Sequence, residues 1–306
     1  MSEAFTVVAA FTVAALLLSA VYFRRYQITR PPIGVFNRRD IATFLVLIVL
    51  TPYLYLSAPS TLVAGLLAMA TLSTLYFTLQ PLVRRGGPAL VAAAVLVAAD
   101  VGVAVGAGLG SKSFLAVNNV VLLAVVVGVT NLWAQSGMRA ADVTLMALGL
   151  SVYDVVATSH LSLMQDLLQR LSEVPLVPMF AWGVDGNGLA VGLGDMLLAA
   201  AFPLVMRKAF GRRAGSTALA VSVGGTMAML ALVQSGAVGT LPAMVALGPL
   251  MGLQYLIWHR RTPQERRTRE YLAAEPFGGR LIAPNPADGG RLLADAALIQ
   301  PMAEGR

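Results

Sequence analysis

The sequence contains no cysteine, which excludes disulfide bonds, thiolate catalysis and thiolate metal ligands. Histidine is almost as scarce, because His160 and His259 are the only two in 306 residues. A histidine-rich metal centre is therefore not expected, and nothing else in the sequence predicts a metal ion or a cofactor. Charged residues make up only 12 % of the chain, about half of their usual share in soluble domains.

Apolar residues are abundant instead, at 57 % of the chain, and the mean hydropathy is +0.74. This composition indicates an integral membrane protein, surrounded by the lipid bilayer. The net charge of +7 would suggest nucleic-acid binding in a soluble protein. Here most basic residues lie in short stretches between apolar runs, as orientation in a bilayer requires, so no nucleic-acid partner is expected.

Nine segments have the length and apolarity that a helix needs to cross a hydrocarbon core about 30 Å thick. The first of them has no basic residues before it, so it is predicted to be a spanning helix and not a cleaved signal peptide. We therefore predict an all-α membrane protein in which residues 1–258 form a bundle of nine transmembrane helices. The segments are residues 4–22, 41–58, 61–82, 88–109, 114–134, 140–159, 188–206, 216–235 and 239–258.

Two further stretches lie outside these segments. Residues 160–187 link the sixth segment to the seventh, and apolar side chains recur in them at helical spacing, which is typical of a short amphipathic helix on the membrane surface. Residues 259–306 begin with basic residues and continue with many Gly, Pro and Ala residues, which favours a mostly disordered tail. The apolar positions of the predicted amphipathic helix are Leu161, Met164, Leu167, Leu168 and Leu171.

Basic residues follow every second predicted helix. The positive-inside rule places such segments in the cytoplasm, so the N-terminus is predicted to be outside and the C-terminus inside. Residues 160–187 would then be outside as well. The basic residues that carry this prediction are Arg24, Arg25, Arg30, Arg38, Arg39, Arg84, Arg85, Arg139, Arg207, Lys208, Arg212, Arg213, Arg260, Arg261, Arg266, Arg267 and Arg269.

Two acidic residues lie deep within predicted helices. Asp154 is in the sixth segment, in the sequence SVYDVVA, and Asp195 is in the seventh, in the sequence GLGD. From the helical rise, both carboxyl groups are expected about 10 Å below the outer edge of the hydrocarbon core. Two acids at one depth on consecutive antiparallel helices are placed to face each other.

Two facing carboxyl groups in a low-dielectric site do not both ionise easily, so the pair titrates as a unit. The ionised acid can take a proton from water while the neutral acid polarises a peptide carbonyl, which is the chemistry of aspartic proteases. Gly192 and Gly194 suit this reaction, because without Cβ atoms they let a neighbouring helix or an extended substrate approach the backbone beside Asp195.

Three short motifs resemble those of the presenilin and signal peptide peptidase family of intramembrane aspartyl proteases, and they occur in the same order. Tyr153 and Asp154 on the sixth segment match the first motif, and Gly192–Asp195 on the seventh segment matches the second. The family's third motif, Pro-Ala-Leu, stands at the start of its ninth helix. Here Pro242–Met244 occupies that place, with Met244 instead of leucine.

The resemblance implies a prokaryotic member of the family with a presenilin-like bundle, in which Asp154 and Asp195 are the catalytic pair. It implies that the substrates are transmembrane helices of other proteins or remnant signal peptides, hydrolysed without a cofactor. It also implies that the remaining motif residues shape the site or bind the substrate, namely Tyr153, Gly192, Leu193, Gly194, Pro242, Ala243 and Met244.

Two other functions are compatible with these acids. A proton-coupled secondary transporter could use the same pair, and Asp100, a third acid in mid-segment without a place in the family's motifs, favours this alternative. We predict instead that Asp100 is a buried structural acid, hydrogen-bonded or protonated. Prepilin peptidases share the GLGD sequence, but they continue with a lysine where this chain has Met196 and Leu197, and their site lies at the cytoplasmic face. No feature of the sequence indicates an oligomeric state.

The charge pattern yields a testable orientation. Alkaline phosphatase, which is active only outside the cytoplasm, is expected to be silent when fused after Arg306 and active when inserted within residues 160–187. Phosphatase activity of cells that carry each fusion is the measurement. An active C-terminal fusion with a silent insertion would invert the predicted topology.

Overall fold

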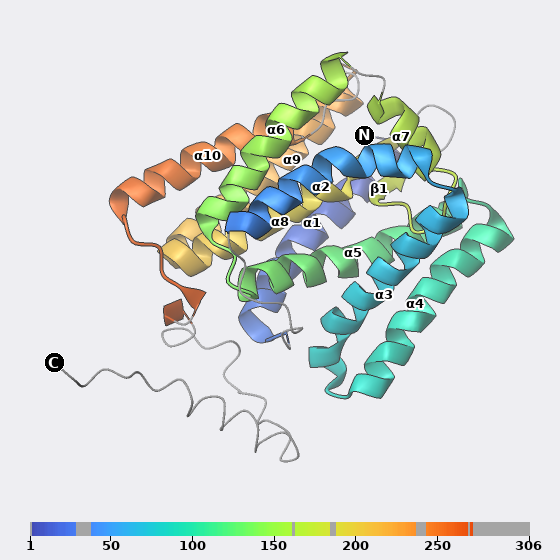
Figure 1. The fold of residues 1–306 in the computed structure, drawn as a ribbon, viewed down its shortest axis with the longest axis horizontal. Helices are drawn as coiled ribbons and strands as arrows, with labels where there is room; N and C mark the ends of the chain where they lie inside the picture. Colours follow the sequence, from blue (N-terminus) through green and yellow to red (C-terminus); the bar gives the residue numbers. More distant parts are fainter. Residues whose placement is uncertain are drawn as a thin grey trace.

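The computed structural model describes residues 2–28, 38–160, 163–183, 188–236, 243–268 and 270–271. Within them the chain forms a bundle of ten helices and one small antiparallel sheet (Figure 1). The helices are α1 (Glu3–Arg25), α2 (Arg38–Ser57), α3 (Ser60–Val83), α4 (Gly86–Ala107), α5 (Lys112–Gln135), α6 (Ala140–His160), α7 (Leu163–Leu171), α8 (Leu193–Phe210), α9 (Arg212–Gln234) and α10 (Met244–Arg261), and the strands are β1 (Met179–Trp182) and β2 (Leu189–Gly192).

Seven of the described helices, α1–α6 and α9, are long and apolar enough to cross a membrane. The predicted multi-pass, mostly helical membrane protein is confirmed at this level. Helices α8 and α10 have 18 residues each, about 27 Å of helix, and their crossing of the membrane is part of the function proposed below.

Each of the nine predicted segments overlaps one of the long helices, α1–α6 and α8–α10. The prediction is wrong at the start of the seventh segment, because Leu189–Gly192 is strand β2 and not helix. In this strand Leu189 and Val191 are buried while Ala190 and Gly192 are exposed, which is the two-residue period of a strand. A short apolar run does not distinguish a strand from a helix by hydropathy alone, which explains the error.

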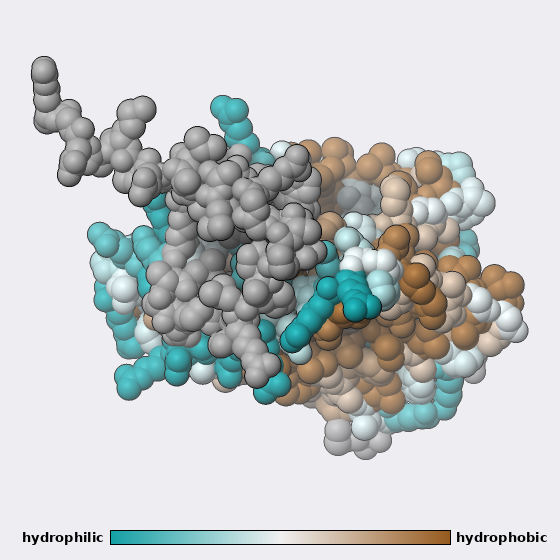
Figure 2. Space-filling model, turned by 90° about the horizontal axis from the view of Figure 1, so that it is seen from below, coloured by the Kyte–Doolittle hydropathy of each residue, from teal (hydrophilic) through white to brown (hydrophobic). Residues whose placement is uncertain are grey.

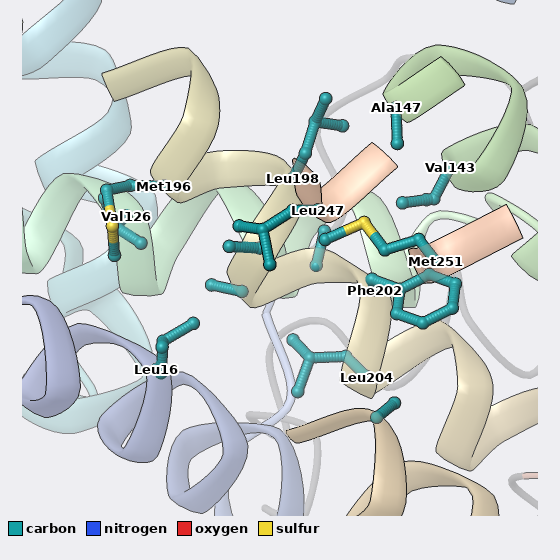
Figure 3. Packing of buried hydrophobic residues seen from close by; sticks show 14 of the residues in the cluster. Leu16, Val126, Val143, Ala147, Met196, Leu198, Phe202, Leu204, Leu247 and Met251 are labelled. Carbon is teal, nitrogen blue, oxygen red and sulfur yellow. The ribbon is translucent and has the colours of Figure 1, made fainter. Parts of the chain in front are cut away.

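Helix α8 is the buried axis of the bundle, since every residue from Leu198 to Met206 is buried. The labelled side chains around it in Figure 3 belong to α1, α5, α6 and α10. The surrounding residues are Leu16 of α1, Val126 of α5, Val143 and Ala147 of α6, and Leu247 and Met251 of α10, around Met196, Leu198, Phe202 and Leu204 of α8. The helix that carries the GLGD acid is thus enclosed by the bundle.

Helices α6 and α10 pack closely because two glycines of α10 face α6. A Cβ atom on Gly248 would lie only 2.7 Å from the carbonyl oxygen of Ala147 and 2.8 Å from Cβ of Ser151. A Cβ atom on Gly252 would lie 3.3 Å from the side chain of Leu148. Small residues at such a contact let two helix backbones approach within a membrane, so α6 and α10 are held as a pair.

The end of the bundle at which α8 terminates is tied by polar contacts. Lys208 of α8 is buried, and its Nζ donates hydrogen bonds to the carbonyl oxygens of Ala134, at 2.7 Å, and Met138, at 2.6 Å. A cation at the last carbonyls of α5 completes hydrogen bonds that a helix end otherwise lacks.

The first residues of the predicted tail contact the helical bundle. The N–H of Arg266 donates to the carbonyl oxygen of Ala209 at 3.2 Å. Tyr271 is buried, and its ring stacks on Phe23 of α1 with 5.6 Å between centroids. Residues 272–306, the remainder of the predicted tail, lie outside the described residues.

The outside of the bundle is largely apolar. Figure 2 shows brown hydrophobic side chains over much of the face that the grey residues leave visible, with teal hydrophilic ones mainly on the left and along the lower right edge. Large aliphatic side chains such as Met69, Val105 and Val152 are exposed on α3, α4 and α6. Lipid is an adequate surrounding for such side chains where water is not, which is consistent with the membrane location.

The amphipathic helix predicted within residues 160–187 corresponds to α7. Its last residue, Leu171, is buried together with Val174 and Val177 against Phe114 of α5, while Asp166 and Gln169 are exposed. The helix therefore covers the end of the bundle with its apolar side. Its contact with the membrane surface stays a prediction.

Candidate active site

Asp195 lies in the first turn of α8, three residues after Gly192, which is the N-cap of the helix. A carboxylate in the first turn is stabilised by the positive end of the helix dipole. The side chain of Asp195 is half-buried. The GLGD motif is thus a strand-to-helix junction whose last residue is an acid in a favourable field.

Asp195 is bonded to the third motif. The backbone N–H of Ala243 donates a hydrogen bond to Oδ2 of Asp195 at 3.1 Å, although the two residues are 48 positions apart. Ala243 immediately precedes α10, and Met244, the first residue of α10, is fully buried. Pro242, the first residue of the motif, lies outside the described residues.

Asp154 lies near the end of α6 and is buried, with 3 % of its surface exposed. Its Oδ2 atom has no hydrogen-bond partner among the described residues. The carboxyl groups of Asp154 and Asp195 are near enough to repel each other electrostatically. The structure therefore brings the two acids together, and their catalytic role stays a prediction.

Tyr153 precedes Asp154 on α6. Its hydroxyl group is buried and has no hydrogen-bond partner within the described part of the chain. This hydroxyl group lies within electrostatic range of the carboxyl group of Asp154 and of the hydroxyl group of Tyr53 on α2. Tyr153 thus has a free hydrogen-bonding group beside the paired acids.

The glycines of the GLGD motif face open space. A Cβ atom on Gly192 or Gly194 would meet no atom of the described chain within 4 Å, and both residues are exposed. No described helix packs on these glycines, so a close contact with a neighbouring helix, one of the two uses predicted for them, is not found among the described residues. Leu193 between them is partly buried against Leu176, and its N–H donates to the carbonyl oxygen of Pro178 at 2.9 Å.

Strand β1 pairs with β2 on one edge and with a side chain on the other. Ala181 lies opposite Ala190 in the antiparallel register. On its other side, Ala181 accepts a hydrogen bond from Nδ2 of Asn119 at 2.9 Å and donates one to Oδ1 of Asn119 at 3.1 Å. The Asn119 amide therefore takes the place of a third strand and closes the far edge of β1.

The far edge of β2 is not closed in this way, because β2 pairs with β1 alone among the described residues. In an antiparallel pair, successive residues direct their N–H and C=O groups alternately toward and away from the partner. Since Ala181 directs its groups to Asn119, Ala190 opposite it directs its groups away from β1, and Gly192 does the same two residues later. The unpaired backbone edge of β2 therefore ends at Gly192, the first residue of the GLGD motif.

This edge was not predicted from the sequence. In the structure the strand is recognised by the alternation of burial along residues 189–192. The segment that leads into β1 is held by the two asparagines of α5, of which Asn118 donates to the carbonyl oxygens of Val177, at 3.1 Å, and Met179, at 3.4 Å. The partners of both asparagines are 59 to 62 residues away, in a segment without helical pattern.

No family model and no curated protein matches this chain. The likeness to presenilins and signal peptide peptidases therefore depends on the three motifs alone. One residue of each motif, namely Asp154, Asp195 and Ala243, lies near the others in the structure.

The role of Asn119 can be tested by replacing it with leucine. Asn119→Leu leaves a backbone donor and acceptor of Ala181 unpaired, so the free energy of unfolding is expected to fall by about 2 kcal/mol. Amide exchange at Ala181 should become faster. Thermal unfolding in detergent and hydrogen–deuterium exchange are the measurements.

Asn118→Leu is the matched control, because Asn118 bonds only to carbonyl groups and the amide of Ala181 keeps its partner. Unchanged exchange at Ala181 in Asn119→Leu would show that Asn119 does not close this edge.

Proposed function

We propose that this protein is an intramembrane aspartyl endopeptidase that hydrolyses peptide bonds within transmembrane helices or remnant signal peptides. The observation that carries the proposal is the meeting of Asp154 of α6 and Asp195 of α8 next to the N-terminus of α10. The proposal includes nine membrane crossings, with α8 and α10 among them.

The surroundings of the two acids differ in a way that suits the reaction. Asp195 accepts a hydrogen bond from the backbone of Ala243 and lies at a helix N-terminus, so it is suited to carry the negative charge. Asp154 is buried with an unpartnered oxygen, so it is suited to hold the proton. Asp195 would then take a proton from water as the oxygen attacks the scissile carbon, while Asp154 donates its proton to the carbonyl oxygen. Asp195 then passes the proton that it took from water to the leaving nitrogen as the C–N bond breaks, and Asp154 regains its proton from a hydroxyl group of the tetrahedral intermediate, which becomes the new carboxylic acid.

The exposed edge of β2 offers a means of holding the substrate. A transmembrane helix satisfies its own backbone hydrogen bonds, so the bond to be cut becomes accessible only when the helix unwinds locally. An unwound segment could add to the edge at Ala190 and Gly192 and regain hydrogen bonds there. The open space at Gly192 and Gly194 would let its backbone pass beside Asp195.

The proposed orientation follows from the basic residues of the sequence. With the C-terminus in the cytoplasm, α6 runs outward and α8 inward, and the paired acids lie nearer the outer face. The preferred substrates are then helices whose N-terminus is in the cytoplasm, as in type II membrane proteins and signal peptides.

A proton-coupled transporter is the second candidate, favoured by the fully buried Asp100 on α4. The two functions differ in what they require. A protease cuts peptides in detergent without a gradient, whereas a transporter in detergent produces no cleavage.

The test of the proposal is cleavage of a model transmembrane peptide by purified protein in detergent, with products identified by mass spectrometry. Asp154→Asn and Asp195→Asn are each expected to lower the rate by at least about a hundredfold, because each removes one half of the acid–base pair. Asparagine is nearly isosteric with aspartate, so the melting temperature should change little.

Asp142→Asn is the matched control. Asp142 is also on α6, where its Oδ2 accepts a hydrogen bond from the N–H of Arg139 at 2.9 Å, and an asparagine there should keep activity. If either Asp154→Asn or Asp195→Asn retained more than a few per cent of the wild-type rate, that residue would have no place in the mechanism.

A shared proton also predicts a bell-shaped dependence of kcat on pH. The rate should rise as the first proton leaves the pair and fall as the second leaves, since only the singly protonated pair has both an acid and a base. Initial rates measured over the range in which the protein stays folded test this. A rate that rises to a plateau without a falling limb would exclude the shared-proton mechanism.

A further inference from the structure

Asp100 is a buried acid that the proposed reaction does not use. It lies in α4, which runs beside α3 at one side of the bundle (Figure 1), and none of its surface is exposed. Its Oδ1 atom accepts a hydrogen bond from the backbone N–H of Leu176 at 2.9 Å. Oδ2 has no hydrogen-bond partner within the described residues. The predicted burial and hydrogen bonding of Asp100 are therefore found, and the bond goes to a segment 76 residues away.

The residue that Asp100 binds has an unusual backbone. Leu176 has φ of 59°, and only one other non-glycine residue of the described chain, Arg84, has a positive φ. The left-handed conformation costs a residue with a Cβ atom roughly 1 to 2 kcal/mol, so it persists where the surroundings hold it. The bond to Asp100 and the burial of the leucine side chain beside Leu75 and Val121 provide that hold.

The held segment is the one on which the GLGD motif begins. Two residues after Leu176, the carbonyl oxygen of Pro178 accepts the hydrogen bond from Leu193, the second residue of the motif. The side chain of Leu193 also packs in the same apolar cluster as Leu176. Asp195 follows Leu193 by two residues in the same helical turn.

We propose that Asp100 is a positioning residue for the active site, acting through Leu176 and Pro178 on the start of α8. Its carboxylate fixes the turn that precedes β1, and this turn fixes where β2 ends and where Asp195 points. The inference rests on the proposed proteolytic function. It assigns Asp100 a role as a hydrogen-bond acceptor, whereas a proton or cation path would require its charge.

The experiment separates these roles by two substitutions. Asp100→Asn keeps an acceptor for the N–H of Leu176 and removes the charge, whereas Asp100→Leu has a similar shape and keeps no acceptor. Asp100→Ala also lacks the acceptor but has a smaller side chain. An effect that is common to Asp100→Leu and Asp100→Ala therefore comes from the lost acceptor and not from altered packing. Asp142→Ala is the matched control, because it removes another carboxylate that accepts from a backbone N–H, at the opposite end of α6 from Asp154.

Two readouts are used, and the first does not depend on catalysis. Hydrogen–deuterium exchange of residues 174–182 should become faster in Asp100→Leu and Asp100→Ala and stay as in the wild type in Asp100→Asn and Asp142→Ala. For cleavage of a model transmembrane peptide, kcat should fall on the order of tenfold to a hundredfold in Asp100→Leu, because small displacements of a reacting group cost that much. KM should change less than kcat, and Asp100→Asn should restore the rate to within a few-fold.

The proposal is overturned if Asp100→Asn is as impaired as Asp100→Leu, since the charge would then be what matters. Unchanged exchange of residues 174–182 in Asp100→Leu also overturns it, because the segment would not depend on the bond. If exchange responds as expected but the wild-type protein cuts no peptide, the proteolytic function fails and the role of Asp100 in positioning an active site fails with it, while the hydrogen bond of Asp100 to Leu176 stands.

Discussion

The hydrogen bond from the backbone of Ala243 to Asp195 connects the parts of the molecule on which the candidate site depends. It joins the start of α10 to the start of α8. Helix α10 is in turn held against α6 by the close contacts of Gly248 and Gly252. Since α6 carries Asp154, the chain of contacts closes on the second acid. A carboxylate within an apolar bundle needs such donors, because an unpaired charge there costs several kcal/mol.

Much of the fold follows from hydropathy. The long helices were predictable because each needs an apolar run of about 20 residues, and such runs are plain in a chain with few charges. The convergence of Asp154 and Asp195 followed from depth along two consecutive helices. The family resemblance added Ala243, which no periodicity would have placed next to an acid 48 residues earlier.

The sheet and the tether of Asp100 were not predictable in the same way. Strand β2 has only four residues, and its pattern is lost in the apolar helix that follows. The partner of Asp100, Leu176, lies just before β1, and the partner of Asn119, Ala181, lies within β1, and no repeat or motif marks either residue. Single long-range hydrogen bonds from a side chain to a distant backbone leave no periodic trace in a sequence, so only the folded chain reveals them.

The contacts of Lys208 and Tyr271 make the two ends of the bundle differ in how firmly their elements are held together. At one end, α1, α5, α8 and the beginning of the tail are fastened together by hydrogen bonds and stacked rings. At the other end, Gly192 and Gly194 at the start of α8 contact no other described part of the chain, and strand β2 has one edge without a partner among the described residues. The opposite end of the bundle thus serves as a base, while a strip of backbone beside Asp195 stays open. For the proposed protease, an unwound segment of substrate could reach this strip without any rearrangement of the helices that hold the two acids.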